Sequence, residues 1–169
     1  MASYEDIMKE AWKRTCEAYE QRRFTPELEE DIQCYLYHEC LVGLKEDATK
    51  IHAKVSRGEK TKKGEWVFPD LSFGNDEFVV EIKFVAPGFT SQQAGRVKRS
   101  AEDSMEVMSR NAWYKKRKRM LVFFDAKHHV WQDGREEIQK AGPGIPVLFY
   151  PKDAASFRPD GSISTPKDW

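Results

Sequence analysis

The segment from Glu65 to Val85 constrains the fold of this chain more than any other segment. It contains two runs that are rich in β-branched and aromatic residues, and these runs flank Gly74, Asn75 and Asp76. Such runs on either side of a short polar turn are typical of an antiparallel β-hairpin. We therefore expect two neighbouring strands that pair through a turn centred on Asn75 and Asp76.

This turn determines which residues face each other across the hairpin. Side chains alternate between the two faces of a strand. One face is therefore expected to be apolar, and its facing pairs are Phe73 with Phe78, Leu71 with Val80, and Pro69 with Ile82. On the other face Asp70 is expected opposite Glu81, with Lys83 one step further along. Two carboxylates and one amine should therefore converge on one surface.

Asp70 and Glu81 are expected to repel each other, because directly opposed residues on a sheet lie only about 4.5–5.5 Å apart at Cβ. A protonated carboxyl would relieve this repulsion, and so would a divalent cation held between the two oxygens. A metal ion lowers the pKa of a bound water, and a nearby lysine positions that water or stabilises developing charge. The pattern predicts metal-dependent hydrolysis of phosphodiester bonds.

Pro69-Asp70 followed by Glu81-Ile82-Lys83 resembles the PD-(D/E)xK motif of the restriction-endonuclease-like nuclease superfamily. The resemblance implies a DNA endonuclease in which Asp70, Glu81 and the main-chain carbonyl of Ile82 bind Mg²⁺ or Mn²⁺. Lys83 then acts on the water or on the developing charge. The resemblance also implies an α/β (α+β) fold with an αβββαβ core, in which helices flank a central mixed sheet, over residues 25–150.

Nucleases of this superfamily usually supply a further glutamate from the first helix of the core. Thr25 suits the N-cap of such a helix, and Pro26 suits its first position. By the resemblance, Glu29 is the matching acid. Glu39 is the alternative, because its helical angle lies within the apolar stripe of this helix, where a carboxylate should be paired or bound. That stripe is predicted to contain Leu28, Ile32, Tyr35 and Leu36.

Periodicity and capping signals predict the other elements. A helix from Thr90 or Ser91 to about Arg110 should follow the hairpin. The remaining expected elements are a packing helix over residues 4–21, strands over 51–55, 119–125 and 145–150, and a short helix over 134–140. We expect one domain over residues 1–169, divided into an N-terminal packing helix (1–24), a core (25–150) and a loop-like tail (151–169).

Basic residues are concentrated in segments beside the hairpin, although the whole chain carries 28 basic and 28 acidic residues. Residues 51–63 contain five basic residues and one acid, and residues 91–119 contain nine basic residues and three acids. This distribution favours a nucleic-acid partner, DNA in particular. The candidate contacts are Lys62, Lys63, Gln92, Gln93, Arg96, Lys98 and Arg99.

Two alternatives to a DNA endonuclease stay open from the sequence. One is an RNA endonuclease of the viral cap-snatching type, with His38 as a helix-borne metal ligand. The other is a module that binds nucleic acid without cutting it. His52 is a further candidate ligand. A chain of this size would need a homodimer or a higher symmetric oligomer to cut at a specific sequence.

The sequence also bears on the cellular setting. No apolar run approaches the length of a membrane span, and residues 1–6 lack the pattern of a secretory signal. We expect a cytoplasmic or nucleoid-associated protein that is neither secreted nor bound to a membrane. The three cysteines, Cys16, Cys34 and Cys40, are expected to be buried thiols on helices.

Overall fold

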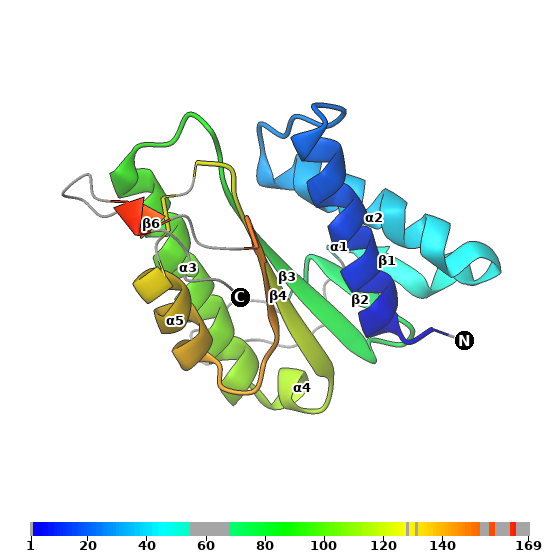
Figure 1. The fold of residues 1–169 in the computed structure, drawn as a ribbon. Helices are drawn as coiled ribbons and strands as arrows, with labels where there is room; N and C mark the ends of the chain where they lie inside the picture. The colour runs from blue at the N-terminus through cyan, green and yellow to red at the C-terminus, as the bar shows by residue number, and fades with distance from the viewer. Residues whose placement is uncertain are drawn as a thin grey trace.

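A mixed five-stranded sheet forms the centre of the molecule (Figure 1). The computed structural model describes residues 2–54, 68–127, 129–130, 132–152, 156–157 and 163–164. The strands lie in chain order, as β1 (Ile51–Ala53), β2 (Leu71–Phe73), β3 (Phe78–Val85), β4 (Lys118–Asp125) and β5 (Val147–Tyr150). The pairs β1–β2 and β2–β3 are antiparallel, whereas the pairs β3–β4 and β4–β5 are parallel.

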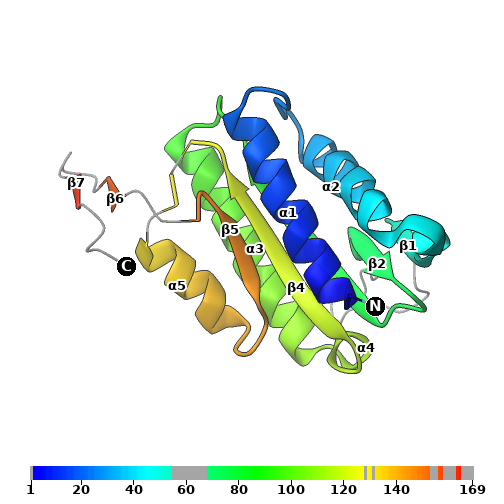
Figure 2. The ribbon, with the colours of Figure 1, turned by 45° about the vertical axis from the view of Figure 1, so that its right-hand side comes forward.

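Helices cover both faces of this sheet (Figure 1 and Figure 2). One face carries α1 (Tyr4–Glu20) and α2 (Glu29–Leu44), and the 3-10 helix η1 (Lys45–Lys50) leads from α2 into β1. The other face carries α3 (Ser91–Arg110), α4 (Ala112–Lys115) and α5 (Gln132–Ala141). The parallel step from β3 to β4 passes through α3 and α4, because parallel strands need a long crossover. The predicted mixed sheet between helices is confirmed.

The β2–β3 hairpin has the predicted register. The facing pairs are Leu71 with Val80 and Phe73 with Phe78. In the turn, Gly74 and Asp76 adopt positive φ angles of 63° and 62°, and glycine takes up this conformation at little cost. The first arm is shorter than expected, because β2 begins at Leu71. The expected start of that arm, residues 65–67, lies outside the described residues.

Strand β3 separates two hydrophobic cores. The core beneath α1 and α2 receives its even-numbered residues, Phe78, Val80, Ile82 and Phe84. The core beneath α3, α4 and α5 receives Val79 and Val85. Because side chains alternate along a strand, Glu81 and Lys83 project on the same face as Val79 and Val85. The predicted facing is therefore confirmed for the apolar side, whereas Glu81 and Lys83 share the other side with two buried valines.

The start of α2 differs from the prediction. The helix begins at Glu29 instead of Pro26, and its N-cap is Leu28 instead of Thr25. The carboxylate of Asp31 accepts hydrogen bonds from the N–H groups of Glu27 and Leu28, both at 2.9 Å. This acid satisfies the donors that a Thr25 cap would have served. Leu28 is consequently 61% exposed and does not belong to the core stripe.

Smaller differences occur elsewhere in the chain. Cys34 is exposed, which corrects the expectation of three buried thiols, whereas Cys40 is buried. The expected loop-like tail contains two short strands, β6 (Ser156–Phe157) and β7 (Ile163–Ser164), which pair with each other. None of the helices within the described ranges is long and apolar enough to cross a membrane.

Candidate functional site

Asp70, Glu81 and Lys83 come together where β2 meets the middle of β3. The main-chain N–H of Ile82 donates to Oδ2 of Asp70 over 2.7 Å, and this bond ties the residue before β2 to β3. Nζ of Lys83 lies 3.8 Å from Oε2 of Glu81 and donates to the carbonyl of Ile82 over 3.1 Å. The structure thus groups two carboxylates, one ammonium and the carbonyl that the sequence pattern had singled out.

The three charged side chains of this cluster are largely withdrawn from solvent. Asp70 is 7% exposed, and the side chains of Lys83 and Glu81 are 12% and 13% exposed. Burial raises the pKa of Glu81 from 4.5 to about 8, and the nearby carboxyl of Asp70 adds to the rise, whereas Lys83 opposes it. This shift favours the protonated form of Glu81, which reduces the expected repulsion between the two acids.

Lys54 joins the cluster from the β1 side. The β1–β2 register pairs Ala53 with Leu71, so its continuation by one residue places Lys54 opposite Asp70. The N–H of Lys54 donates to the carbonyl of Asp70 over 3.2 Å. Burial disfavours the charged form of Lys54, but Glu30, 3.3 Å from its ammonium, and Asp70 outweigh this effect and raise its pKa. The excess of basic residues over 51–63 was the only sequence signal for Lys54.

Helix α2 brings Glu29 towards the same cluster. Gln33 lies one helical turn after Glu29 on the same face of the helix, and its side-chain amide donates to the carbonyl of Asp70 over 2.7 Å. Partial burial raises the pKa of Glu29, Lys83 opposes the rise, and Asp70 adds to it. Glu29 therefore lies within electrostatic range of both residues.

Glu39, the alternative helix acid, has a different role. Nε of Arg14 donates to its Oε2 over 2.6 Å, and Nη2 of Arg14 donates to its main-chain carbonyl over 2.9 Å. This ion pair joins α1 to α2 and accounts for a carboxylate within the apolar stripe. The geometry therefore favours Glu29 over Glu39 as the acid that α2 contributes to the site.

Tyr114 of α4 is a member of the site that the sequence did not reveal. Its hydroxyl donates to Oε1 of Glu81 over 2.9 Å, and the residue is only 3% exposed. Burial and the adjacent Glu81 raise the pKa of the hydroxyl, so it remains a hydrogen-bond donor. A lone tyrosine before a basic run has no spacing that would connect it to residue 81, so only the tertiary structure identifies it.

The two histidine candidates lie on α2 and on β1. His38 follows Glu29 by nine residues on α2, which corresponds to about 13 Å along the helix axis. His52 is exposed on β1, where it pairs with Ser72. Within the described ranges, no three His, Cys, Asp or Glu side chains form a group that could hold a metal ion. The candidate donor set here is smaller, with two carboxylates and one main-chain carbonyl.

The candidate nucleic-acid contacts separate into three groups. Gln93 takes part in the N-terminal cap of α3, where Oε1 accepts from the N–H of Thr90 over 2.8 Å. Lys98 pairs with Glu102 at 2.9 Å and with Glu137 of α5, so it would have to leave two carboxylates to reach a phosphate. The side chains of Gln92, Arg96 and Arg99 are exposed along α3. Lys62 and Lys63 lie outside the described residues.

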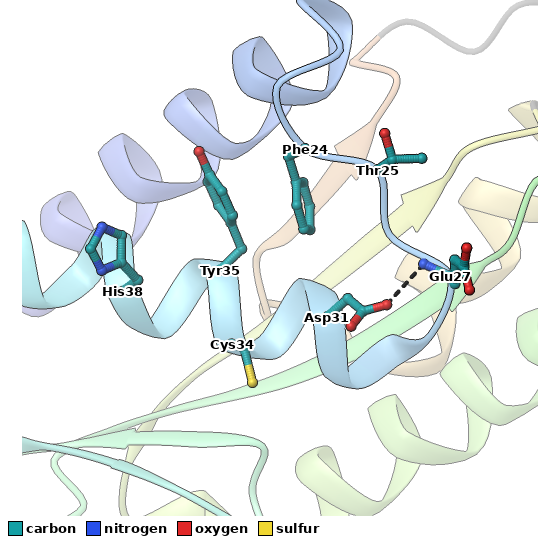
Figure 3. A pocket seen from close by; sticks show the side chains of 7 residues that line it. All are labelled: Phe24, Thr25, Glu27, Asp31, Cys34, Tyr35 and His38. Carbon is teal, nitrogen blue, oxygen red and sulfur yellow. Dashed lines mark hydrogen bonds between the residues drawn. The ribbon is translucent and has the colours of Figure 1, made fainter.

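A groove of about 560 Å³ lies beside the first half of α2 (Figure 3). Phe24 stacks on Tyr35 in this groove, with ring centroids 4.3 Å apart. The described residues that line it include the acids Glu27 and Asp31 but no lysine or arginine. Among these residues only His38 is basic, and it lies in a lining that also holds two acids, so we assign no phosphodiester chemistry to this groove.

Comparisons with protein-family models, with curated proteins and with solved structures gave no significant match. The geometry alone therefore defines the class to which this chain is assigned. It is a mixed α/β protein with a five-stranded sheet, in which a buried acidic cluster lies at the junction of a hairpin and a helix.

Proposed function

We propose that this protein is a metal-dependent endonuclease that hydrolyses phosphodiester bonds in DNA. The proposal depends on one observation. Asp70, Glu81, Lys83 and the carbonyl of Ile82 form one cluster, in which Nζ of Lys83 lies 3.8 Å from Glu81 and 3.1 Å from that carbonyl. A buried group of two acids and an amine is costly to maintain, and the same set can hold a divalent ion beside a positive charge, as metal-assisted hydrolysis uses.

The topology supports the proposal. From α2 to β4 the chain forms a helix, a three-stranded antiparallel meander, a helical crossover and a strand parallel to the last strand of the meander. This order agrees with the αβββαβ core of restriction-endonuclease-like nucleases. Asp70 directly precedes the second strand, and Glu81 and Lys83 lie within the third. This placement on one hairpin supports the resemblance to the motif.

The donor set fits a hard divalent cation. Asp70, Glu81 and the carbonyl of Ile82 offer only oxygen atoms, which Mg²⁺ and Mn²⁺ prefer. Such an ion, when bound, would lower the pKa of a water molecule and offset the charge of the phosphate. The ammonium of Lys83 lies 3.8 Å from Glu81 and bonds to the carbonyl of Ile82, so a divalent ion would compete with it for the same oxygens.

The other residues of the cluster have roles that follow from their charges. Lys83 supplies a positive charge beside Glu81, where it can position water or stabilise charge on a phosphate oxygen. Lys54 supplies a second positive charge, whose ammonium pairs with Glu30 and interacts with Asp70. Glu29 contributes an outer acid from α2, and Gln33 fixes that face of the helix to Asp70.

A cleavage assay tests the proposal. Purified protein is incubated with Mg²⁺ or Mn²⁺ and with duplex, junction or single-stranded DNA, and the products are resolved by size. We expect cleavage of at least one DNA substrate, loss of cleavage in Asp70→Ala, and retention in Asp103→Ala, an exposed acid on α3. If no substrate is cut with either ion, the proposal is wrong.

RNA substrates in the same assay test the first alternative. Preferential cleavage of RNA with Mn²⁺ would favour a cap-snatching type of endonuclease, although His38 lies away from the cluster. Calorimetric titration tests the second alternative, because a module that only binds nucleic acid has no need for a divalent ion at Asp70 and Glu81.

A further inference from the structure

The two carboxylate oxygens of Glu81 have different surroundings. Oε1 accepts a hydrogen bond from the hydroxyl of Tyr114 over 2.9 Å. Oε2 lies 3.8 Å from Nζ of Lys83, which also donates to the carbonyl of Ile82. One oxygen is therefore tied to the protein, whereas the other points to the cluster where the candidate ligands meet.

The phenol of Tyr114 is held firmly. Oδ1 of Asn111 caps α4 and accepts from the N–H groups of Trp113 and Tyr114 at 2.8 and 3.4 Å. The ring of Trp113 packs edge-on against that of Tyr114, with centroids 5.0 Å apart. The guanidinium of Arg117 lies 3.7 Å from the centre of the Trp113 ring. The cap and this stack restrict Tyr114, so its hydroxyl in turn restricts Glu81.

We infer that Tyr114 is a positioning residue that limits Glu81 to binding a divalent ion through the single oxygen Oε2, and thereby favours Mg²⁺ over Ca²⁺. This inference rests on the proposed function, because it takes Glu81 as a metal ligand. Mg²⁺ requires near-octahedral geometry, whereas Ca²⁺ takes six to eight oxygens and readily accepts both oxygens of one carboxylate. A hydrogen bond from a second residue orients such a ligand.

A purely structural role for Tyr114 would have a different consequence. If its hydroxyl used Glu81 only as a buried acceptor, loss of the bond would change the affinity for Mg²⁺ and Ca²⁺ by the same factor. If the bond restricts Glu81, its loss releases Oε1 for binding. The affinity for Mg²⁺ then falls, while that for Ca²⁺ falls less or rises. The ratio of the two affinities therefore separates the two roles.

The experiment is a calorimetric titration of MgCl₂ and, separately, of CaCl₂ into the whole chain and into Tyr114→Phe. The variant keeps the ring and its packing on Trp113. We expect a fall in Mg²⁺ affinity of about 10- to 100-fold, and a decrease of about tenfold or more in the ratio of Mg²⁺ to Ca²⁺ affinity. Tyr150→Phe, a buried tyrosine on β5, is the matched control and should leave the ratio unchanged.

A second variant covers the case in which Tyr114→Phe does not fold. Asn111→Ala removes the cap of α4 but keeps the phenol, and it should lower the ratio in the same direction. An unchanged ratio in the variants that fold overturns the inference. The proposed function would still stand in that case if the original chain binds Mg²⁺ and Asp70→Ala abolishes this binding. If the original chain binds no Mg²⁺ at all, the proposed function fails and the inference fails with it.

Discussion

Gln33 and Asp70 are joined by a hydrogen bond of 2.7 Å, from the side-chain amide of the glutamine to the main-chain carbonyl of the aspartate. Gln33 is 6% exposed and Asp70 is 7% exposed, so water is largely excluded from this bond. The same carbonyl accepts from the N–H of Lys54 over 3.2 Å. One atom of the candidate site thus connects α2, the end of β1 and the start of the hairpin.

Replacement of Gln33 by leucine should lower both the stability of the fold and the affinity of the site for Mg²⁺. The carbonyl of Asp70 keeps one donor, so we expect a loss of about 0.5–1.5 kcal/mol in the free energy of unfolding. Urea denaturation and calorimetric Mg²⁺ titration measure the two effects. The control is Gln139→Leu, which replaces an exposed glutamine on α5. A Gln33→Leu protein with the stability and the Mg²⁺ affinity of the original chain would contradict the prediction.

The buried Glu81 should make the metal-free protein less stable as the pH rises. Its pKa is raised from 4.5 to about 8 in the folded state, so between these values the folded chain binds more protons than the unfolded chain. Stability from this group is therefore fully present below pH 4.5 and is lost as the pH rises through about 8. Urea denaturation in EDTA at pH 5.5 and pH 8.5 measures this loss.

Glu81→Gln should reduce this dependence of stability on pH, because the amide does not titrate. Asp103→Asn, an exposed acid on α3, serves as the control and should keep the slope of the original chain. A Glu81→Gln protein whose stability falls with pH as steeply as that of the original chain would show that another group is responsible.

Asp70→Asn should stabilise the metal-free protein while abolishing cleavage. The amide oxygen of asparagine can still accept from the N–H of Ile82, and the substitution removes the repulsion with Glu81. We expect a gain of roughly 0.2–1 kcal/mol at pH 8, where like charges on facing strands are costly. Thermal unfolding in EDTA checks the gain. A destabilised Asp70→Asn would mean that the negative charge itself supports the fold through Lys54 or Lys83.

Lys83→Met should separate metal binding from chemistry. The ammonium of Lys83 lies beside Glu81 and bonds to the carbonyl of Ile82, so its removal should leave Mg²⁺ affinity unchanged or stronger. Cleavage should fall by roughly 100- to 1,000-fold if Lys83 stabilises developing charge. Calorimetry and single-turnover cleavage measure the two quantities. Lys140→Met, an exposed lysine on α5, is the control, and undiminished cleavage in Lys83→Met would refute the assigned role.

The exposed arginines of α3 offer a test of DNA contact. Arg96→Ala and Arg99→Ala should each weaken binding of duplex DNA in EDTA, and each should reduce the slope of log affinity against log salt by about 1. Fluorescence anisotropy over a range of salt concentrations measures both. The control is Arg110→Ala, because Arg110 lies at the other end of the same helix and pairs with Glu106 at 3.3 Å. Equal losses in all three variants would indicate a general charge effect instead of a contact surface.

The hairpin shows how much local sequence can determine. Its register followed from the turn residues and from side-chain alternation, because both are properties of a few adjacent residues. The same reasoning failed for the start of α2. There Asp31 competes with Thr25 for the same N–H groups, and the sequence does not show which of the two acceptors satisfies those donors.

Distance along the chain limits what the sequence could predict for the site. Asp70, Glu81 and Lys83 were found because they lie on one hairpin, where register alone fixes their positions. Tyr114 and Gln33 are separated from their partners in the site by 33 and 37 residues, and no spacing rule connects them. Glu29 and Glu39 were both plausible until Arg14, on a different helix, was found to bind Glu39.

The sequence by itself determined the mixed α/β class, the apolar and charged faces of the hairpin, and the three residues that define the candidate chemistry. Only the tertiary structure decided which helix acid approaches them, which lysine bonds to the carbonyl of Asp70 and which tyrosine holds Glu81. The physical reason is that alternation and capping act over a few residues, whereas the packing of α2 and α4 against the sheet depends on contacts between segments far apart in the chain.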